Sequence, residues 1–495
     1  MKKLSLQTTK YIVSQIQMDL DLQMLVFDLW GTIAHTLMLY KQNIISEKQA
    51  KNILKALKTI KQKVNKSEYE INPAKGSQLS LEASVIELAG EDGKAMHTAR
   101  SRNDQVMTTE LLFLKEKTLL QLDEIKKTIE LLVKLSQKHQ KTVMSGYTHM
   151  QPAKMTSFAQ WCLAYAKALL RSASSFQYYY DQYNICPLGA CEGYGTSWNI
   201  NREYTAKLLG FSKVWDIPQD VVSSRGFYQL GLLKAQEELT LVMSKIAQDL
   251  LLFNTFEFGF VSLGENIAQR LHPITGSSIM AQKKNPDVLE LIRSSSSNLS
   301  GLHSGLAQTL SKLPMGYNRD SREAKEYVSQ GFSKTEATLS SLQEVLATIE
   351  VNKEKMLQLV EANYSLTTEL ADFISQETKI PYRTIYKIVG NVVAGKITNK
   401  QLVGDITIAD LEKEAKKQDL SINLSNKQIQ SALSPDQILQ KRKHIGGSAT
   451  QMINTSTQNI FEEIKLLDFW IAAQWKIINK AKQLTKQKVE GIVKS

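Results

Sequence analysis

Cysteine and long uncharged apolar runs are both scarce in this chain of 495 residues. The 3 cysteines, Cys162, Cys186 and Cys191, form no CxxC pair. We therefore expect free thiols in a reducing cytoplasm and no structural metal site. The most apolar run, 24–39, is shorter than a bilayer span and contains Asp28, so we expect no membrane-spanning helix.

Proline and strand signals are also sparse, and helical patterns fill the sequence between the prolines. Only 9 prolines occur. Apolar residues recur at three- and four-residue spacing over 108–142, 229–260 and 326–350, and another helical run follows Pro286. Amphipathic helices of this length bury their apolar stripes against one another in bundles. The sequence therefore predicts an all-α protein built on a bundle of long helices.

The long helical segments also divide the chain. Shorter helical patterns precede Met96, and more loop-rich sequence follows Val351. We predict an N-terminal helical domain, a central long-helix bundle and a C-terminal helical domain, at 1–99, 100–350 and 351–495.

The net charge of +12 comes mostly from lysine. Nucleic-acid binding is one interpretation of such a charge. However, the lysines alternate with glutamates along the helices, and the basic runs 58–63 and 440–444 lack interleaved aromatic residues. We interpret the charge as a solvated surface and expect no nucleic-acid partner. Mild attraction of an anionic small molecule remains an alternative.

Three polar segments interrupt the helical pattern, at 96–105, 145–155 and 274–293. Each concentrates hydroxyls, amides and cations beside a long helix, where backbone N–H groups bind carboxylates or phosphates. A single such segment would be explained as a capping loop, and Asn285 before Pro286 fits an N-cap followed by a first-turn proline. Three segments, each with a cation or histidine, favour a binding site for an anion.

The three segments carry specific motifs. Residues 276–287 read GSSIMAQKKNPD, which matches the signature Gly-Ser-Ser-x-Met-Pro-x-Lys-x-Asn of the fumarase and aspartase superfamily. HTARSRNDQV at 97–106 and GYTHMQPA at 146–153 match the argininosuccinate lyase forms of the other two. The sequence therefore resembles the argininosuccinate lyase family. The likeness covers nearly the whole chain and extends to 187–211, 313–326, 367–373 and 440–450.

The resemblance implies the reversible elimination of an amine, arginine in this family, from an N-substituted aspartate, with release of fumarate. It assigns Ser277 as the base that removes the proton beside a carboxylate. Lys283 and the following helix would activate the serine, and Lys283 with Asn285 would stabilise the charge that develops on the carboxylate. His149, paired with Glu290, would protonate the leaving amine or organise a water molecule.

The resemblance also implies the substrate contacts and the assembly. The fumarate half would be held by Ser101, Arg102, Asn103, Thr148 and Thr275. The amine half would be held by Tyr317, Lys325 and the position occupied by Arg322. No cofactor and no metal are implied. The central bundle would assemble into the helix core of a homotetramer, in which each site for the small-molecule substrate draws on three subunits.

Several positions depart from the family pattern. Ala281 replaces the signature proline, and Gln78 replaces a histidine. Gly226 and Ala324 each replace an aspartate, Gln17 replaces a serine, and Arg322 replaces a glutamine that contacts the arginine half. Arginine is always charged and prefers a carboxylate partner. It would repel a substrate guanidinium and would suit an amine with an additional carboxylate.

Three hypotheses follow from these residues. The first is an argininosuccinate lyase that acts in arginine biosynthesis. The second is a paralogous carbon–nitrogen lyase with another amine half, which Arg322 favours. The third is a non-catalytic structural relative. The intact elimination residues count against the third hypothesis, and the persistence of the family motifs places the first ahead of the second.

Overall fold

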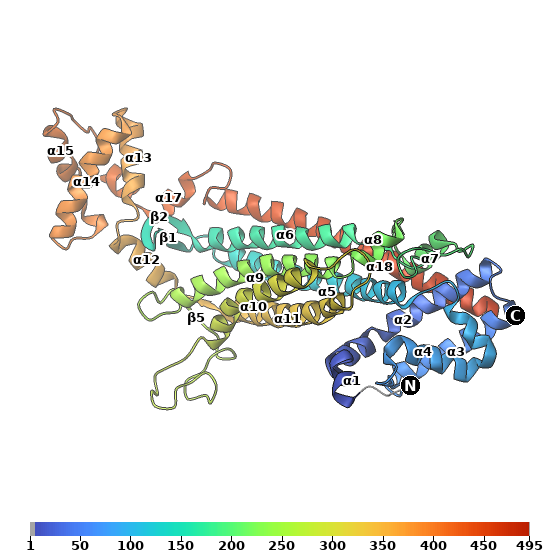
Figure 1. Ribbon diagram of the computed structural model, residues 1–495. Helices are drawn as coiled ribbons and strands as arrows, with labels where there is room; N and C mark the ends of the chain where they lie inside the picture. The colour runs from blue at the N-terminus through green and yellow to red at the C-terminus, as the bar shows by residue number, and fades with distance from the viewer. Residues whose placement is uncertain (1–4, 495) are drawn as a thin grey trace.

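The computed structural model describes residues 5–494, and most of them are helical. The chain begins with four helices that form the end of the molecule nearest the N-terminus (Figure 1). They are α1 (Leu6–Ile12), α2 (Gln15–Lys41), α3 (Glu47–Asn65) and α4 (Gly76–Ala89), followed by the 3₁₀ helix η1 (Gly90–His97). Leu25, Leu57 and Leu81 are fully buried where α2, α3 and α4 meet.

Long helices run side by side through the centre of the molecule (Figure 1). They are α5 (Arg102–Lys138), α6 (Phe158–Gln182), α9 (Phe227–Phe253), α10 (Asp287–Leu310) and α11 (Ala324–Thr348). The predicted helices are thereby confirmed, although their ends differ by several residues. The 37 residues of α5 correspond to a helix about 55 Å long at 1.5 Å per residue. Two short helices, α7 (Arg202–Leu209) and α8 (Pro218–Ser223), join α6 to α9.

A second group of short helices lies beyond the other end of the bundle (Figure 1). It comprises α12 (Lys353–Ala362), α13 (Thr367–Thr378), α14 (Tyr382–Thr398), η3 (Val403–Asp405), α15 (Ile408–Lys416), α16 (Asn426–Ala432) and α17 (Pro435–Lys441). The last helix, α18 (Thr450–Lys494), returns along the bundle, and its Ile460 and Ile471 join the bundle core. The division of the chain into domains at 99 and 350 stays a prediction. In the predicted C-terminal domain, α12–α17 form a core of their own, whereas α18 joins the bundle core.

In the described residues the strands form three short two-stranded sheets, and most residues are helical, so the all-α prediction is confirmed. Between α5 and α6, β1 (Val143–Thr148) pairs antiparallel with β2 (Gln151–Ser157). The other pairs are β3 (Ile185–Cys186) with β4 (Lys213–Val214), and β5 (Val261–Ser262) with β6 (Glu350–Val351). The segment 145–155 is the β1–β2 hairpin and not a capping loop, the alternative that a single polar segment would have suggested. Its two-residue turn, His149–Met150, lacks the glycine that usually signals such a turn.

Helix α2 is apolar and long enough to cross a membrane by length and composition alone. However, 78% of its most apolar window is buried inside the protein. Trp30 on α2 donates from its indole nitrogen to the Leu208 carbonyl oxygen on α7, 3.2 Å away. Helix α2 is therefore a core helix of this fold. The three cysteines are free and buried.

Close packing of α9 against α6 gives a first prediction. A Cβ atom at Gly231 on α9 would lie 2.3 Å from a ring carbon of Tyr179 on α6, whereas a Cβ at the exposed Gly301 on α10 would meet nothing within 4 Å. Gly231→Ala should lower the free energy of unfolding by about 1–3 kcal/mol, because the core cannot accommodate the methyl group. Gly301→Ala, the control, should raise it by up to about 1 kcal/mol. Denaturant unfolding measures both values, and equal effects would contradict this packing.

Candidate active site

The first polar segment forms the N-terminus of α5. Ser101 caps this helix, since its Oγ accepts from the backbone N–H of Asn103 at 3.3 Å. Asp104 accepts from the backbone N–H groups of Gly189 at 2.8 Å and Cys191 at 2.9 Å, which fixes the segment to the loop before α7. Burial raises the pKa of Asp104 to about 6. The Arg102 side chain is exposed and free to meet an anion.

The predicted contacts to the amine half lie at the same end of the bundle, on the 3₁₀ helix η2 (Arg319–Glu323) and at the start of α11. Lys325 is buried and forms an ion pair with Asp21 of α2. An Nη2–Oδ2 distance of 3.7 Å separates Arg322 from the same aspartate, and Arg322 also donates to the Ile12 carbonyl oxygen at 3.1 Å. Arg322 therefore turns into the protein, and Asp21 offsets part of its charge.

A buried ion pair joins this region to α5. Arg225 Nη2 lies 3.1 Å from Glu110 Oε1, and Gln229 donates to the other carboxylate oxygen at 2.8 Å. The Arg225 guanidinium lies 5.4 Å from the centre of the Tyr317 ring. Tyr317 is thus held against a fixed cation. Gly226, which follows Arg225, has φ of 98°, a backbone conformation that favours glycine.

Sequence reasoning missed Asp21 and Glu110. Asp21 follows Asp19 by two residues on the apolar helix α2. Glu110 lies on the bundle face of α5, where it is 2% exposed. A carboxylate is buried only when it has partners, so an acid at a core position of the helical pattern was a signal for Glu110. The partly buried Asp21 gave no such signal.

The signature segment is a loop that projects from the bundle between β5 and α10 (Figure 1). Ser277 Oγ accepts from the backbone N–H groups of Ile279 at 3.3 Å and Met280 at 3.0 Å. These donors favour negative charge on the serine oxygen, as activation of a serine base requires. Lys283 is exposed in the same loop.

The base of the loop is closed by contacts between its two arms. The backbone N–H of Asn285 donates to the Thr275 carbonyl oxygen at 2.8 Å, and the Asn285 amide donates to Gly276 O at 3.3 Å. Asn285 therefore does not cap α10, the alternative that its place before Pro286 had allowed. Its side chain turns back into the loop, and Pro286 occupies the cap. The loop holds Thr275, Ser277 and Asn285 together.

His149 lies at the tip of the β1–β2 hairpin, and both it and Thr148 are exposed. Glu290 is exposed in the first turn of α10. Over residues 5–494, no hydrogen bond or ion pair joins His149 to Glu290, or joins any two of the three polar segments. A single chain does not assemble the predicted residues into one site.

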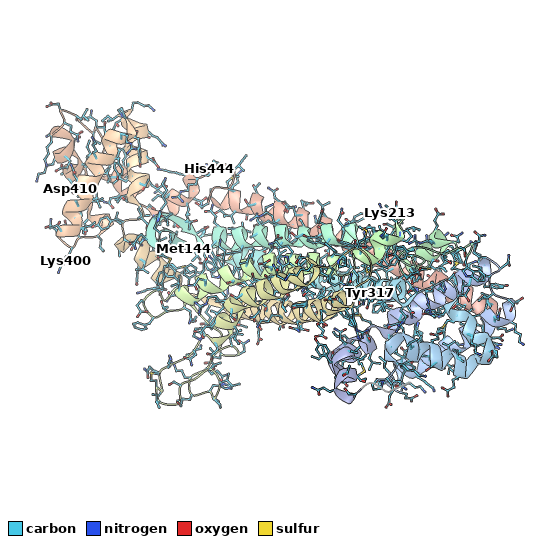
Figure 2. All side chains as sticks on the ribbon, in the orientation of Figure 1. Met144, Lys213, Tyr317, Lys400, Asp410 and His444 are labelled. Carbon is cyan, nitrogen blue, oxygen red and sulfur yellow. The ribbon has the colours of Figure 1, made fainter. Side chains whose placement is uncertain are left out.

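The separation of the segments follows from the bundle. Figure 2 shows Met144, in strand β1 of the hairpin, toward one end of the bundle. Tyr317, a predicted contact to the amine half, lies toward the other end. The Ser101 segment and the hairpin flank α5 and are therefore about 55 Å apart along its axis. Across the described part of the chain, no cluster of three His, Cys, Asp or Glu side chains is arranged to hold a metal ion.

Comparison with known proteins identifies the family. A profile described as lyase matches residues 2–301, and one described as argininosuccinate lyase C-terminal matches 364–440. The chain is 35% identical to an argininosuccinate lyase of Methanocaldococcus jannaschii, covering 96% of this chain and 95% of the relative. It is also 35% identical to an argininosuccinate lyase of Bacillus cereus, over 95% and 94%. The chain belongs to the argininosuccinate lyase family.

Solved structures share the fold of this argininosuccinate lyase family member. An EDDS lyase in complex with formate matches at a TM-score of 0.86 and 25% identity, over 100% of this chain and 97% of that one. A class II fumarase from Schistosoma mansoni matches at a TM-score of 0.68 and 17% identity, over 84% and 90%. The resemblance found in the sequence, including the superfamily, is confirmed.

Proposed function

We propose that this protein is an argininosuccinate lyase, a carbon–nitrogen lyase that cleaves argininosuccinate into arginine and fumarate in arginine biosynthesis. The observation that carries the proposal is the match to argininosuccinate lyases over nearly the whole chain. The signature loop supports it, because its backbone already directs two N–H donors at Ser277 Oγ.

The proposed reaction begins at the signature loop. Ser277 removes a proton from the carbon beside a substrate carboxylate, and the negative charge spreads onto that carboxylate. Lys283 and Asn285 hold the carboxylate and stabilise its second charge. The electron pair left on the carbon then forms the C=C bond of fumarate as the C–N bond breaks, and the C–N electron pair leaves with the nitrogen. These steps are acid–base steps, and side chains of the protein supply them without a cofactor.

His149 is the proposed source of the proton for the departing nitrogen. Glu290 would orient and charge the imidazole, as a carboxylate partner does for a catalytic histidine. Thr148, Thr275, Ser101, Arg102 and Asn103 would bind the fumarate half through hydroxyl, guanidinium and amide groups.

Tyr317, Arg322 and Lys325 are the proposed contacts to the amine half. Asp21 contacts both Lys325 and Arg322. The guanidinium of a bound substrate would therefore have an anionic neighbour, Asp21, as well as these two cations. This arrangement supports binding of arginine despite the replacement of glutamine by Arg322.

We also propose that the active protein is a cytoplasmic homotetramer with shared sites. The polar segments are far apart in one chain, so a complete site needs residues from other copies. Large apolar side chains are exposed on the long helices, with Leu241 on α9 at 50% and Leu291 on α10 at 64%. Packing of these helices against other copies would bury them and extend the bundle.

A second candidate, a lyase for another N-substituted aspartate, is favoured by Arg322. Its guanidinium prefers a carboxylate partner, and it would have to turn from Asp21 toward the site to bind an additional carboxylate on the amine. Fumarate release from argininosuccinate and from a panel of other N-substituted aspartates, followed by absorbance, separates the two candidates. The highest kcat/KM should be found for argininosuccinate, and a higher value for another member of the panel would establish the second candidate.

Ser277→Ala should abolish fumarate release while substrate binding survives. The substitution removes the proposed base but leaves the carboxylate contacts of Lys283 and Asn285. A loss of kcat by a factor of about 10²–10⁴ or more is expected, with calorimetric binding of argininosuccinate retained. Ser278→Ala serves as the matched control, since its hydroxyl is not the proposed base. Near-normal turnover by Ser277→Ala would refute the assignment.

Asp21→Asn should raise the KM for argininosuccinate more than Arg322→Gln does. Without the aspartate, the two cations would face the substrate guanidinium without a counter-charge, in a partly dry region where such repulsion is strong. We expect KM for argininosuccinate to rise about tenfold in Asp21→Asn, equivalent to about 1.4 kcal/mol, and to stay level or fall in Arg322→Gln. An unchanged KM in Asp21→Asn would contradict this account of Arg322.

A further inference from the structure

The hairpin that carries His149 is anchored in the C-terminal helices. Val143 in β1 and Met155 in β2 are buried in the apolar core of α12–α17, and neither belongs to the bundle core. The tip of the same hairpin is exposed. On the other side of the hairpin, Met144 belongs to the bundle core and Tyr147 packs against it. The position of His149 therefore depends on both groups of helices, and side chains of the C-terminal group supply polar contacts to the two strands.

Strand β1 is held through Ser145, which is fully buried. The Ser145 hydroxyl lies 3.0 Å from the Ser365 hydroxyl, and the Asn363 amide donates to it at 2.8 Å. Asn363 and Ser365 belong to the connection between α12 and α13. One strand of the hairpin is thus hydrogen-bonded by side chains to the C-terminal helices.

Strand β2 is held by an ionic cluster. Arg442, just after α17, donates from Nη1 to the Met155 carbonyl oxygen, and its Nη2 lies 2.6 Å from Glu369 Oε1 on α13. The same carboxylate oxygen lies 3.3 Å from Lys154 Nζ. Both Arg442 and Glu369 side chains are 17% exposed. Glu369 therefore bridges two cations that fix consecutive residues of β2.

The turn itself requires such support. His149 has φ of 53° and Met150 has φ of 59°, so both occupy the left-handed region that favours glycine. Residues with side chains remain in this conformation only when the surrounding structure imposes it. The strands next to the turn supply that constraint, and the C-terminal helices fix the strands together with the bundle core.

We propose that Glu369 and Arg442 are positioning residues for His149, acting through the backbone and the Lys154 side chain of β2. The catalytic part of this inference rests on the proposed function, because it takes His149 as the proton donor. A proton donor displaced by about 1 Å can lose up to about a hundredfold in rate while the substrate still binds. Loss of this ionic cluster should therefore lower kcat and leave KM nearly unchanged.

The test uses Glu369→Gln in the full-length protein. This substitution keeps the side-chain shape and removes the charge that bridges Arg442 and Lys154. We expect faster hydrogen–deuterium exchange in the β1–β2 amides, kcat lower by about tenfold, and KM within about twofold of wild type. Lys443→Ala is the matched control, because it removes an exposed cation beside Arg442 and should leave the exchange rates, kcat and KM unchanged.

A second pair of variants separates positioning from folding. Arg442→Lys keeps a cation beside Glu369 and should therefore retain part of the kcat that Arg442→Ala loses. If Glu369→Gln does not fold, the comparison of these two Arg442 variants takes its place as the test. Unchanged hairpin exchange and kcat in a folded Glu369→Gln, or a rise in KM with normal kcat, would overturn the proposal. If the wild-type protein releases no fumarate, the proposed function fails, while the exchange experiment still decides whether this cluster holds the hairpin.

Discussion

The length of the buried helices is the constraint on which the rest of this structure depends. Leu111, Leu122 and Leu132 lie along one face of α5 and are buried almost completely. A helix of 37 residues stays regular only where neighbouring helices bury such a face over its whole length. Polar segments that must meet a substrate are therefore excluded from the middle of the bundle and lie where the helices end.

Because polar segments lie only where the long helices end, the charged side chains that could bind a substrate are also found at helix ends. Arg102 and Lys283 are exposed beside helix ends, where they can meet carboxylates. At the region predicted to bind the amine half, in contrast, Arg322 and Lys325 contact Asp21. The first arrangement suits a dicarboxylate, and the second suits a group that carries its own positive charge. One chain therefore supplies two different electrostatic environments, each at a helix terminus.

The sequence predicted the long helices because burial of one face leaves a regular apolar period, which local sequence alone reveals. It did not predict the hairpin, because the turn at His149 and Met150 uses left-handed residues without glycine. The sequence also could not show that α18 packs on the bundle, because an amphipathic pattern does not indicate which other helices cover the apolar face. The roles of Ser277, His149 and Lys283 come from family motifs and remain predictions, whereas Asp21 and Glu369 emerged only from tertiary contacts.

The central claim is that residues from different copies of the chain form each site. Mixing Ser277→Ala with His149→Asn, each inactive alone, and then unfolding and refolding them together tests it directly. Some mixed assemblies would contain a site with both native residues, so part of the fumarate-releasing activity should return, and light scattering should show an oligomer. A monomer in solution, or refolded mixed oligomers that never regain activity, would contradict the claim.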